Sequence, residues 1–349
     1  MRRRPSPGRI DVCLSVDVEF TPNNALACPE RPPLGDDWVY GTAGGRSQGL
    51  GFLLGCLRRY GLKGTFFTEV FNTYYFTDAP MARVAADILA DGHDVQLHLH
   101  PVWRRFLNPR WRDEPVLPPL GSDSFVNREP AEVAKLLLDG CDILGRLGAK
   151  RPIAFRCGNL DAGGVIYQGM REAGLKLASN VGLALHRPAE AALCRYAGLC
   201  TFSGIVEVPV TSYRLPLLKR RLSLLSITGS SFAEMRRVLT VASHKGVGPI
   251  VVLMHPHDFH IPLTDGVSAR PRYVPDRLRQ RRLEQLCRFV TANRSRFRVT
   301  TFADSVGRWT ALAARQASDG DPVMTSSLRG LVLRTIENKV RPVMLRLPQ

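Results

Sequence analysis

Two pairs of side chains with metal-binding chemistry stand two residues apart in apolar segments of the sequence. Asp17 and Glu19 end the segment DVCLSVDVEF, and His98 and His100 lie in HDVQLHLHP. Residues two apart share one face of a β-strand, so each pair is expected to point into one site. Two carboxylates buried together are costly unless a cation or a proton lies between them. With the imidazoles they offer three or four ligands of the kind that bind Zn²⁺.

A third apolar segment, VVLMHPHDF, brings His255, His257 and Asp258 to the end of another predicted strand. A histidine whose tautomer is fixed by a carboxylate is suited to protonate a leaving amine. His255 is the better candidate for this role because it lies closest to the strand. Two interpretations of His257 stay open: a metal ligand, or a contact of Asp258.

A fourth segment, IAFRCGN, places Arg156 and Asn159 just beyond a strand. Arg156 also has two interpretations, an ion pair with Asp17 or the binding of a substrate phosphate or carboxylate. Each motif taken alone has a structural explanation, since carboxylates at strand ends cap helices and single histidines are often core residues. Four strands that end in compatible groups together favour an active site.

The elements that must position these residues alternate between short β-branched segments and longer segments of helical period, as in repeated βα units. The predicted strands are 10–18, 63–69, 93–99, 152–156, 175–180, 204–210, 249–255 and 297–301. The predicted helices are 46–60, 80–91, 129–148, 163–173, 230–244, 276–293 and 302–314. This pattern predicts an α/β fold, a distorted (β/α)7–8 barrel with parallel strands, followed by a basic helical tail.

The barrel is expected to span residues 10–314 as one domain, after a basic N-terminal extension at 1–9 and before a C-terminal tail at 315–349. Two long loops, 20–45 and 101–128, interrupt the alternation and are candidates for the walls of a substrate pocket. Trp103 in the second loop offers a ring that would stack on a sugar, although loop aromatics also serve as hydrophobic plugs.

The 349-residue chain carries a net charge of +17, and residues 270–298 alone hold ten Arg against one Asp and one Glu. Such a field attracts anionic partners, but no recognisable nucleic-acid module is present, so nucleic acid is not expected to be a partner. In the tail, Leu328, Val332 and Ile336 recur at helical spacing among arginines. Such a helix either makes peripheral contact with an anionic membrane or docks on the barrel or a partner. Because neither a signal peptide nor a long apolar segment is found, the expected location is cytoplasmic, extending to the inner face of the membrane.

Over about residues 10–305 the chain resembles the polysaccharide deacetylase superfamily (NodB-homology domain, carbohydrate esterase family 4). The motifs that carry the resemblance are, in order, SVDVE at 15–19, GTFF at 64–67, DGHDVQLHLHP at 91–101, FRCGN at 155–159 and LMHPHDF at 253–259. The resemblance implies a distorted barrel that binds a divalent metal through an acid and two histidines. It also implies removal of N-acyl groups from amino sugars.

By this resemblance Asp17 matches the catalytic base and His255 the general acid. The family's usual metal-binding aspartate is replaced by Val18, so the ligand role is assigned to Glu19, and the division of roles between the two carboxylates is open. The family's histidine pair is usually four apart, whereas Val102 stands four residues after His98. The other two ligands are therefore taken as His98 and His100. The residues assigned to substrate binding are Arg156, Asn159, Trp103, His257 and Asp258.

The implied enzyme is a metal-dependent amidohydrolase, a carbohydrate N-deacetylase that acts on a C–N bond other than a peptide. Its expected metal is Zn²⁺, with Co²⁺, Mn²⁺ and Ni²⁺ as alternatives. The expected substrate is an amino sugar linked to a nucleotide or to polyprenyl phosphate, as an intermediate of glycan or lipopolysaccharide synthesis. The alternatives are a deformylase of a lipid-linked aminosugar, a metal-dependent phosphoesterase, and a non-catalytic sugar-binding relative.

Overall fold

Strand β1, Ile10–Val18, is buried along its whole length. Such a strand is typical of a parallel sheet covered on both faces, and it explains the unbroken apolar run in the sequence. It pairs in parallel with β4 (Thr65–Glu69), β12 (Ile250–Met254) and β15 (Phe297–Val299). The computed structural model describes residues 8–113, 123–216, 221–263, 271–315 and 323–344. Most of the predicted N-terminal extension, and residues 316–322 and 345–349 of the predicted tail, lie outside these ranges.

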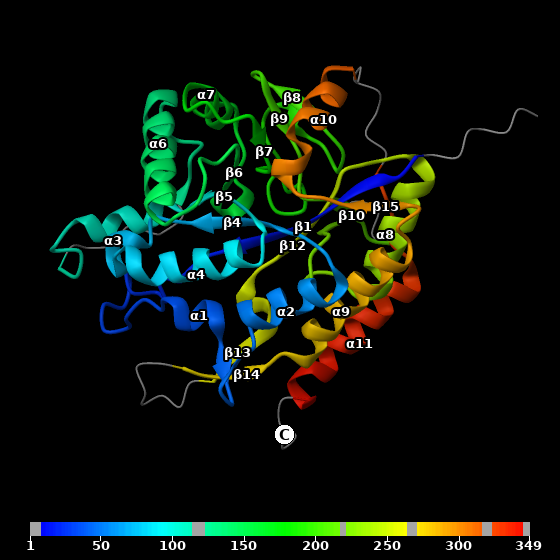
Figure 1. Ribbon diagram of the computed structural model, residues 1–349, viewed down its shortest axis with the longest axis horizontal. Helices are drawn as coiled ribbons and strands as arrows, with labels where there is room; N and C mark the ends of the chain where they lie inside the picture. Colours follow the sequence, from blue (N-terminus) through cyan, green and yellow to red (C-terminus); the bar gives the residue numbers. More distant parts are fainter. Residues whose placement is uncertain (1–7, 114–122, 217–220, 264–270, 316–322, 345–349) are drawn as a thin grey trace, which may run out of the picture.

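From β4 the sheet continues as an almost entirely parallel array. Its further strands are β5 (Asp94–Leu99), β6 (Ala154–Cys157), β7 (Leu177–Ala178), β9 (Ile205–Glu207) and, antiparallel to β9, β8 (Cys200–Phe202). Within the described residues no ladder joins β8 back to β12, so the sheet is a strongly curled, open half-barrel (Figure 1). The predicted distorted barrel of parallel strands is thereby confirmed, and all eight predicted strands are present.

Helices cover the sheet at the positions that the helical periodicity predicted. They are α2 (Leu50–Tyr60), α4 (Asp78–Ala90), α6 (Pro130–Arg146), α7 (Gly164–Glu172), α8 (Phe232–Lys245), α9 (Arg277–Ala292) and α10 (Phe302–Arg315). Their ends follow local chemistry. Pro130 stands in the first turn of α6, and Ser231 caps α8 in a capping box with Glu234.

Shorter elements that periodicity did not predict fill the connections. They are α1 (Asp36–Tyr40), α3 (Thr73–Phe76), a 3₁₀ segment at Pro101–Leu107, and the hairpins β2–β3 (Thr42–Ala43 and Arg46–Ser47), β10–β11 (Ser212–Arg214 and Leu222–Leu224) and β13–β14 (His260–Leu263 and Arg272–Pro275). Helix α1 and strand β2 lie in the loop 20–45, β3 occupies the start of the range predicted as helix 46–60, and the 3₁₀ segment begins the loop 101–128. Both predicted pocket walls therefore contain structure of their own.

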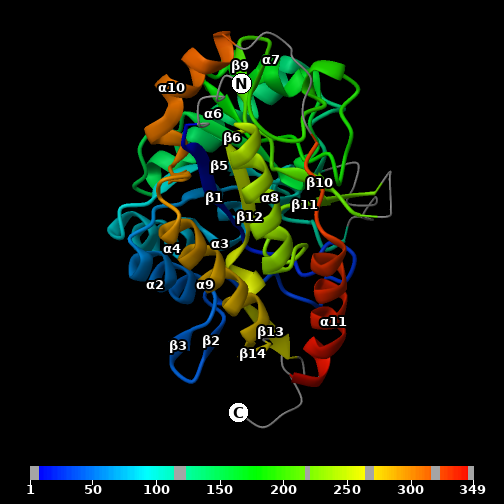
Figure 2. The same ribbon diagram turned by 90° about the vertical axis from the view of Figure 1, so that its right-hand side faces the viewer.

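In the described residues of the tail, helix α11 (Leu328–Met344) lies beside α8 and α9 (Figure 2). Of the two interpretations that the sequence left open, docking on the barrel is the contact seen. None of the helices in the described ranges is long and apolar enough to cross a membrane.

Candidate metal centre and active site

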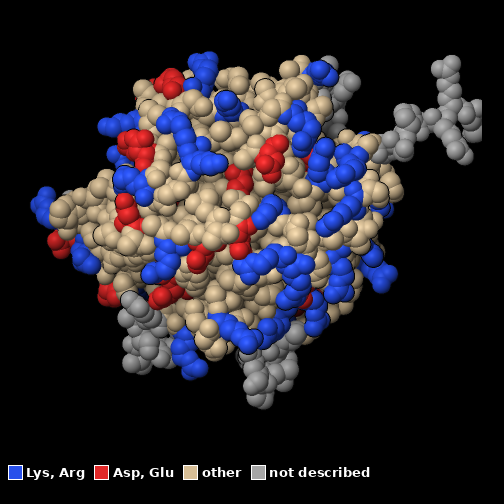
Figure 3. Space-filling view, viewed as in Figure 1, with Lys and Arg blue, Asp and Glu red and all other residues tan. Residues whose placement is uncertain are grey.

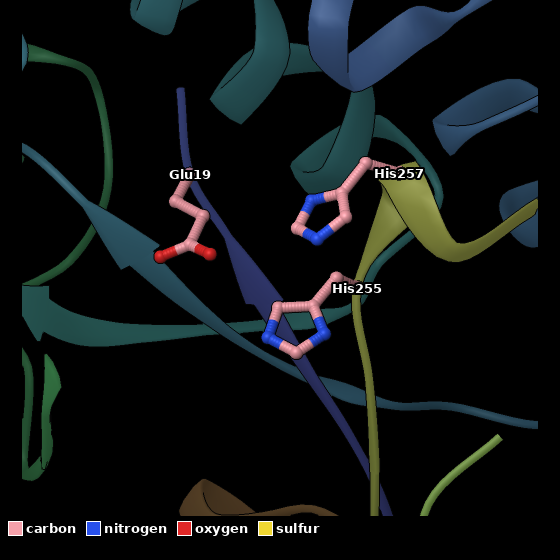
Figure 4. A group of neighbouring side chains, drawn as sticks. All are labelled: Glu19, His255 and His257. Carbon is pink, nitrogen blue, oxygen red and sulfur yellow. The ribbon is translucent and has the colours of Figure 1, made fainter. Parts of the chain in front are cut away.

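The side chains singled out in the sequence gather at the carboxyl ends of β1, β5, β6 and β12. Because these strands are parallel, their carboxyl ends meet at one edge of the sheet. Ligand atoms of Glu19, His98 and His100 lie within 4.8 Å of one another, and so do those of Glu19, His255 and His257. In Figure 4, Glu19 extends from the end of β1 toward the two imidazoles that follow β12.

The first of these groups has spacings that suit a tetrahedral metal ion. The Nε2 atoms of His98 and His100 lie 3.5 Å and 3.0 Å from Oε2 of Glu19. Two ligand atoms that each lie about 2.0–2.1 Å from a tetrahedral Zn²⁺ are separated by roughly 3.3–3.4 Å. Three protein ligands leave a fourth position for substrate, as in catalytic zinc sites.

The far side of each imidazole is held by an acceptor. Nδ1 of His98 lies 2.8 Å from the carbonyl oxygen of Arg156, and Nδ1 of His100 lies 2.7 Å from Oδ2 of Asp123. Nδ1 therefore donates in both rings when the imidazoles are neutral, and each Nε2 turns its lone pair toward Glu19. Acceptors that face one another in this way require a cation or protons between them, so this donor set fits a divalent metal.

The pKa values of Glu19 and His100 reflect this close approach of acceptor atoms. Burial raises the pKa of Glu19, but hydrogen bonds from His100 and His98 outweigh it and hold the pKa well below its usual range. Burial lowers the pKa of His100, yet Asp123 and Glu19 raise it well above its usual range. Without a metal, a proton on His100 takes the place of a cation.

The second carboxylate, Asp17, has a different partner. Nη1 of Arg156 lies 2.5 Å from Oδ1 of Asp17, and the guanidinium also donates to Oγ of Ser15 and of Ser179. The side chain of Arg156 is fully buried. Of the two interpretations left open by the sequence, the ion pair with Asp17 is the contact seen. The assignment of Arg156 to substrate binding stays a prediction.

His255 stands on the open side of Asp17, with its Nε2 4.0 Å from Oδ2 of that carboxylate. Oδ2 of Asp258 accepts a hydrogen bond from the backbone N–H of His255 and lies 3.4 Å from its Nδ1. Burial alone would lower the pKa of His255, but the hydrogen bond and charge of Asp258 outweigh it and raise the pKa to about 9. Asp258 is itself buried and positions His255, while its assignment to substrate binding stays a prediction.

A pocket of 400 Å³ opens beside these groups. Its walls include Glu19, His100, Asp123, Asn23, Asn24, Trp38, Trp103 and His257. Trp103 and His257, both assigned to substrate binding, are among the lining residues, but the Trp103 ring is buried against Phe76 and Phe106. Their roles in substrate binding stay predictions. A second cavity, of 590 Å³, is lined by Lys63, His93 and Asp304 and contains none of the groups described above.

Two residues of the site were missed in the sequence. Asp123 holds His100 and also accepts a hydrogen bond from Nδ2 of Asn159. Trp38 stacks near His257, with ring centroids 5.1 Å apart. Both stand in the long loops, and the only signal in the sequence was that these loops follow strands that carry candidate ligands. Asn159 is exposed at the site edge, beside Asp123.

Comparison with solved structures gives matches over most of the chain. A Mycobacterium smegmatis protein described as a polysaccharide deacetylase is 16% identical, with a TM-score of 0.50 over 93% of this chain and 95% of that one. The chain has the polysaccharide deacetylase fold. A family 4 carbohydrate esterase from Streptomyces lividans, in complex with acetate, is 11% identical, with a TM-score of 0.40 over 84% and 93% of the two chains. A family 4 acetyl xylan esterase from Clostridium thermocellum, with a cobalt ion, is 13% identical, with a TM-score of 0.39 over 91% and 99%.

Neither a family model nor a curated protein matches the sequence. The structural match confirms the resemblance drawn from the motifs at the level of the polysaccharide deacetylase fold. In this chain the motifs that hold the site residues stand at the carboxyl ends of β1, β5, β6 and β12, which lie at one edge of the sheet.

Proposed function

We propose that this chain is a metal-dependent hydrolase that removes an N-acyl group from an amino sugar. The observation that carries the proposal is the arrangement at the open end of the half-barrel. Glu19, His98 and His100 form a three-ligand group, and Asp17 and His255 lie 4.0 Å apart beside it. A base and an acid next to a metal group with a free position are the components of amide hydrolysis.

A divalent cation such as Zn²⁺ would polarise the acyl carbonyl when held by Glu19, His98 and His100. Asp17, whose Oδ1 is paired with Arg156, accepts through Oδ2 the proton of the attacking water. The water oxygen joins the acyl carbon, and the C–N bond breaks. His255, whose pKa of about 9 keeps it protonated near neutral pH, donates its Nε2 proton to the departing amine. The products are a carboxylate and an amino sugar.

The pocket beside these groups supports a sugar as substrate. Trp38, which is partly exposed, offers aromatic surface, and Asn23 and Asn24 offer amides for hydroxyl groups. The net charge of +17 favours a substrate that carries phosphate, either a nucleotide-linked or a polyprenyl-phosphate-linked amino sugar. The cytoplasmic location and the role in glycan or lipopolysaccharide synthesis remain predictions, as does the deformylase alternative.

The proposal is tested by incubating zinc-loaded protein with a panel of N-acetyl and N-formyl amino sugars, free, nucleotide-linked and polyprenyl-phosphate-linked. Mass spectrometry of the sugar and assays of acetate and formate identify the substrate and the acyl group. We expect Asp17→Asn and His255→Asn each to lower kcat at least a hundredfold. Asp17→Asn should keep its metal, whereas Glu19→Gln should lose it, because Glu19 and not Asp17 faces the two imidazoles.

The exposed residues Asp142 and His244 provide matched controls, as Asp142→Asn and His244→Asn. Both variants should retain the wild-type rate and metal content. A protein that binds no divalent ion, and whose hydrolysis of every sugar in the panel is the same in Asp17→Asn, would remove the hydrolase proposal. Release of phosphate from a phosphodiester in its place would favour the phosphoesterase.

A further inference from the structure

Helix α11 keeps an apolar stripe exposed after it has docked on the barrel. Leu328, Val332, Ile336 and Val340 recur every fourth residue and remain 51%, 48%, 52% and 43% exposed. Residues four apart lie one above the other on the same helix face. A continuous apolar strip on a folded surface, as opposed to scattered single residues, marks an interaction site.

The opposite face of α11 is fixed to the body by polar contacts. The contacts are Arg334 with the carbonyl of Gly229, Arg282 with Glu337 and Arg341 with Asp276. Arg282 and Asp276 are buried, so two of these anchors reach into the protein. The orientation of the helix is therefore set, and the stripe faces outward in the folded chain.

Basic side chains are exposed on α11 and on the two helices that it contacts. They are Arg329 and Lys339 of α11, next to stripe residues in the sequence, Arg236 and Arg237 of α8, and Arg281 and Arg288 of α9. Among the described residues of these three helices, the exposed charged side chains are all Lys or Arg. The partly exposed Glu284 and Glu337 form ion pairs with Arg59 and Arg282. In Figure 3 the Lys and Arg side chains gather over the part of the molecule where α9 and α11 lie.

We propose that α11 and the basic side chains beside it dock this protein on an anionic membrane surface. Such a surface offers acyl chains for the apolar stripe and negative headgroups for the exposed basic side chains of α8, α9 and α11. A second copy of the chain would bring one basic surface against another, which the charge opposes. An anionic bilayer therefore matches both halves of the pattern.

A chain of polar contacts runs from α11 to His255. Arg341 binds Asp276, Arg279 lies 3.4 Å from Asp276 and donates to the carbonyl of Asp258, and Asp258 holds His255. The docking helix is thus linked to the proposed general acid through Asp276, Arg279 and Asp258. Docking itself does not depend on the proposed hydrolase activity. The consequence that rests on that activity is the use of a lipid-linked amino sugar held at the same membrane.

The test is sedimentation of the full-length protein with vesicles of phosphatidylcholine, with and without phosphatidylglycerol. We expect binding to the anionic vesicles that weakens with salt, and at least tenfold less binding to phosphatidylcholine alone. Val332→Ser with Ile336→Ser should lower the partition coefficient at least tenfold. Arg329→Gln with Lys339→Gln should lower it severalfold and flatten its salt dependence.

Leu185→Ser with Leu312→Ser is the matched control, because these leucines are 57% and 43% exposed but lie outside the stripe. Thermal unfolding of each variant shows that it is folded. Failure of the wild type to bind anionic vesicles, or unchanged binding after loss of Val332 and Ile336, overturns the proposal. So does a concentration-dependent dimer, in light scattering, that the same double variant abolishes. Vesicle binding by a chain that hydrolyses no sugar leaves docking intact and removes only the proposed function.

Discussion

The two carboxylates of the site, Asp17 and Glu19, have different neighbours and therefore different expected roles. Asp17 is paired with the buried guanidinium of Arg156 and faces His255, whereas Glu19 faces two imidazoles. Glu19 faces the lone pairs of two imidazoles, which suits a metal ligand. Asp17 faces the protonated imidazole of His255 at 4.0 Å, which suits proton transfer. The partners, more than the residue types, therefore distinguish base from ligand.

The partner of His255 should control the pH dependence of hydrolysis. Asp258 raises the pKa of His255 to about 9 against the effect of burial, so the general acid stays protonated until the pH rises through that value. In Asp258→Asn burial remains and the charge is gone, so the basic limb of kcat/KM should move down by roughly 1–3 pH units. Rates measured from pH 6 to 10 check this.

Asp113→Asn, at an exposed position, should leave that limb where it is in the wild type. A limb that stays near pH 9 in Asp258→Asn would mean that His255 is not the acid.

Spacing in the sequence was sufficient to predict that the carboxylates Asp17 and Glu19 meet His98, His100 and His255. Each of them stands at the end of a strand, and the ends of parallel strands lie together. Spacing did not predict Asp123. Asp123 stands 23 positions after His100, so their contact could not be predicted from local spacing. Nor did it predict that Arg156 is fully buried, since that depends on Ser15 and Ser179 from other strands.

At the scale of elements, the turn that leaves β6 passes directly under a metal-ligand candidate. A Cβ added to Gly158 would lie 2.5 Å from Nδ1 of His100, closer than side chains approach one another. His100 is held between Glu19 and Asp123, so it cannot move aside without losing one of them. Glycine is therefore required here by close approach of the backbone to a ring.

Gly158→Ala should accordingly weaken zinc binding by about tenfold to a hundredfold, the range seen when a partner that orients a ligand is lost. Competition with a chromophoric chelator measures the affinity. Gly145→Ala in α6 is the control, because nothing lies within 4 Å of its added Cβ. Wild-type zinc affinity in Gly158→Ala would argue against His100 as a ligand.

Strands and long helices were predictable because each must bury one face, which imposes a period on the sequence. The short elements were not. In the loop 20–45, helix α1 is held by contacts with distant parts of the chain, such as Trp38 with His257. The sequence also did not predict that the barrel is open. The parallel array ends at β9, because the next strand of the sheet, β8, pairs with it in antiparallel fashion.

Over the whole molecule, stability should depend on a buried carboxyl group away from the site. Glu207, in β9, accepts hydrogen bonds from Tyr167 of α7 and from the backbone of Asn180 and Val181. These contacts join the sheet to α7 and to the segment that carries Ser179. Burial raises the pKa of Glu207 to about 7, although these hydrogen bonds oppose the rise.

The sign of the pH dependence follows from that pKa. Between its ordinary value of 4.5 and about 7 the folded state binds a proton that the unfolded state has lost, so the free energy of unfolding falls as pH rises. Glu207→Gln removes the titration, and its stability relative to the wild type should increase by up to about 3 kcal/mol between pH 4.5 and 8. Urea unfolding across this range measures the difference, with the exposed Glu172→Gln as control. A difference that is constant with pH would mean that Glu207 stays ionised in the folded chain.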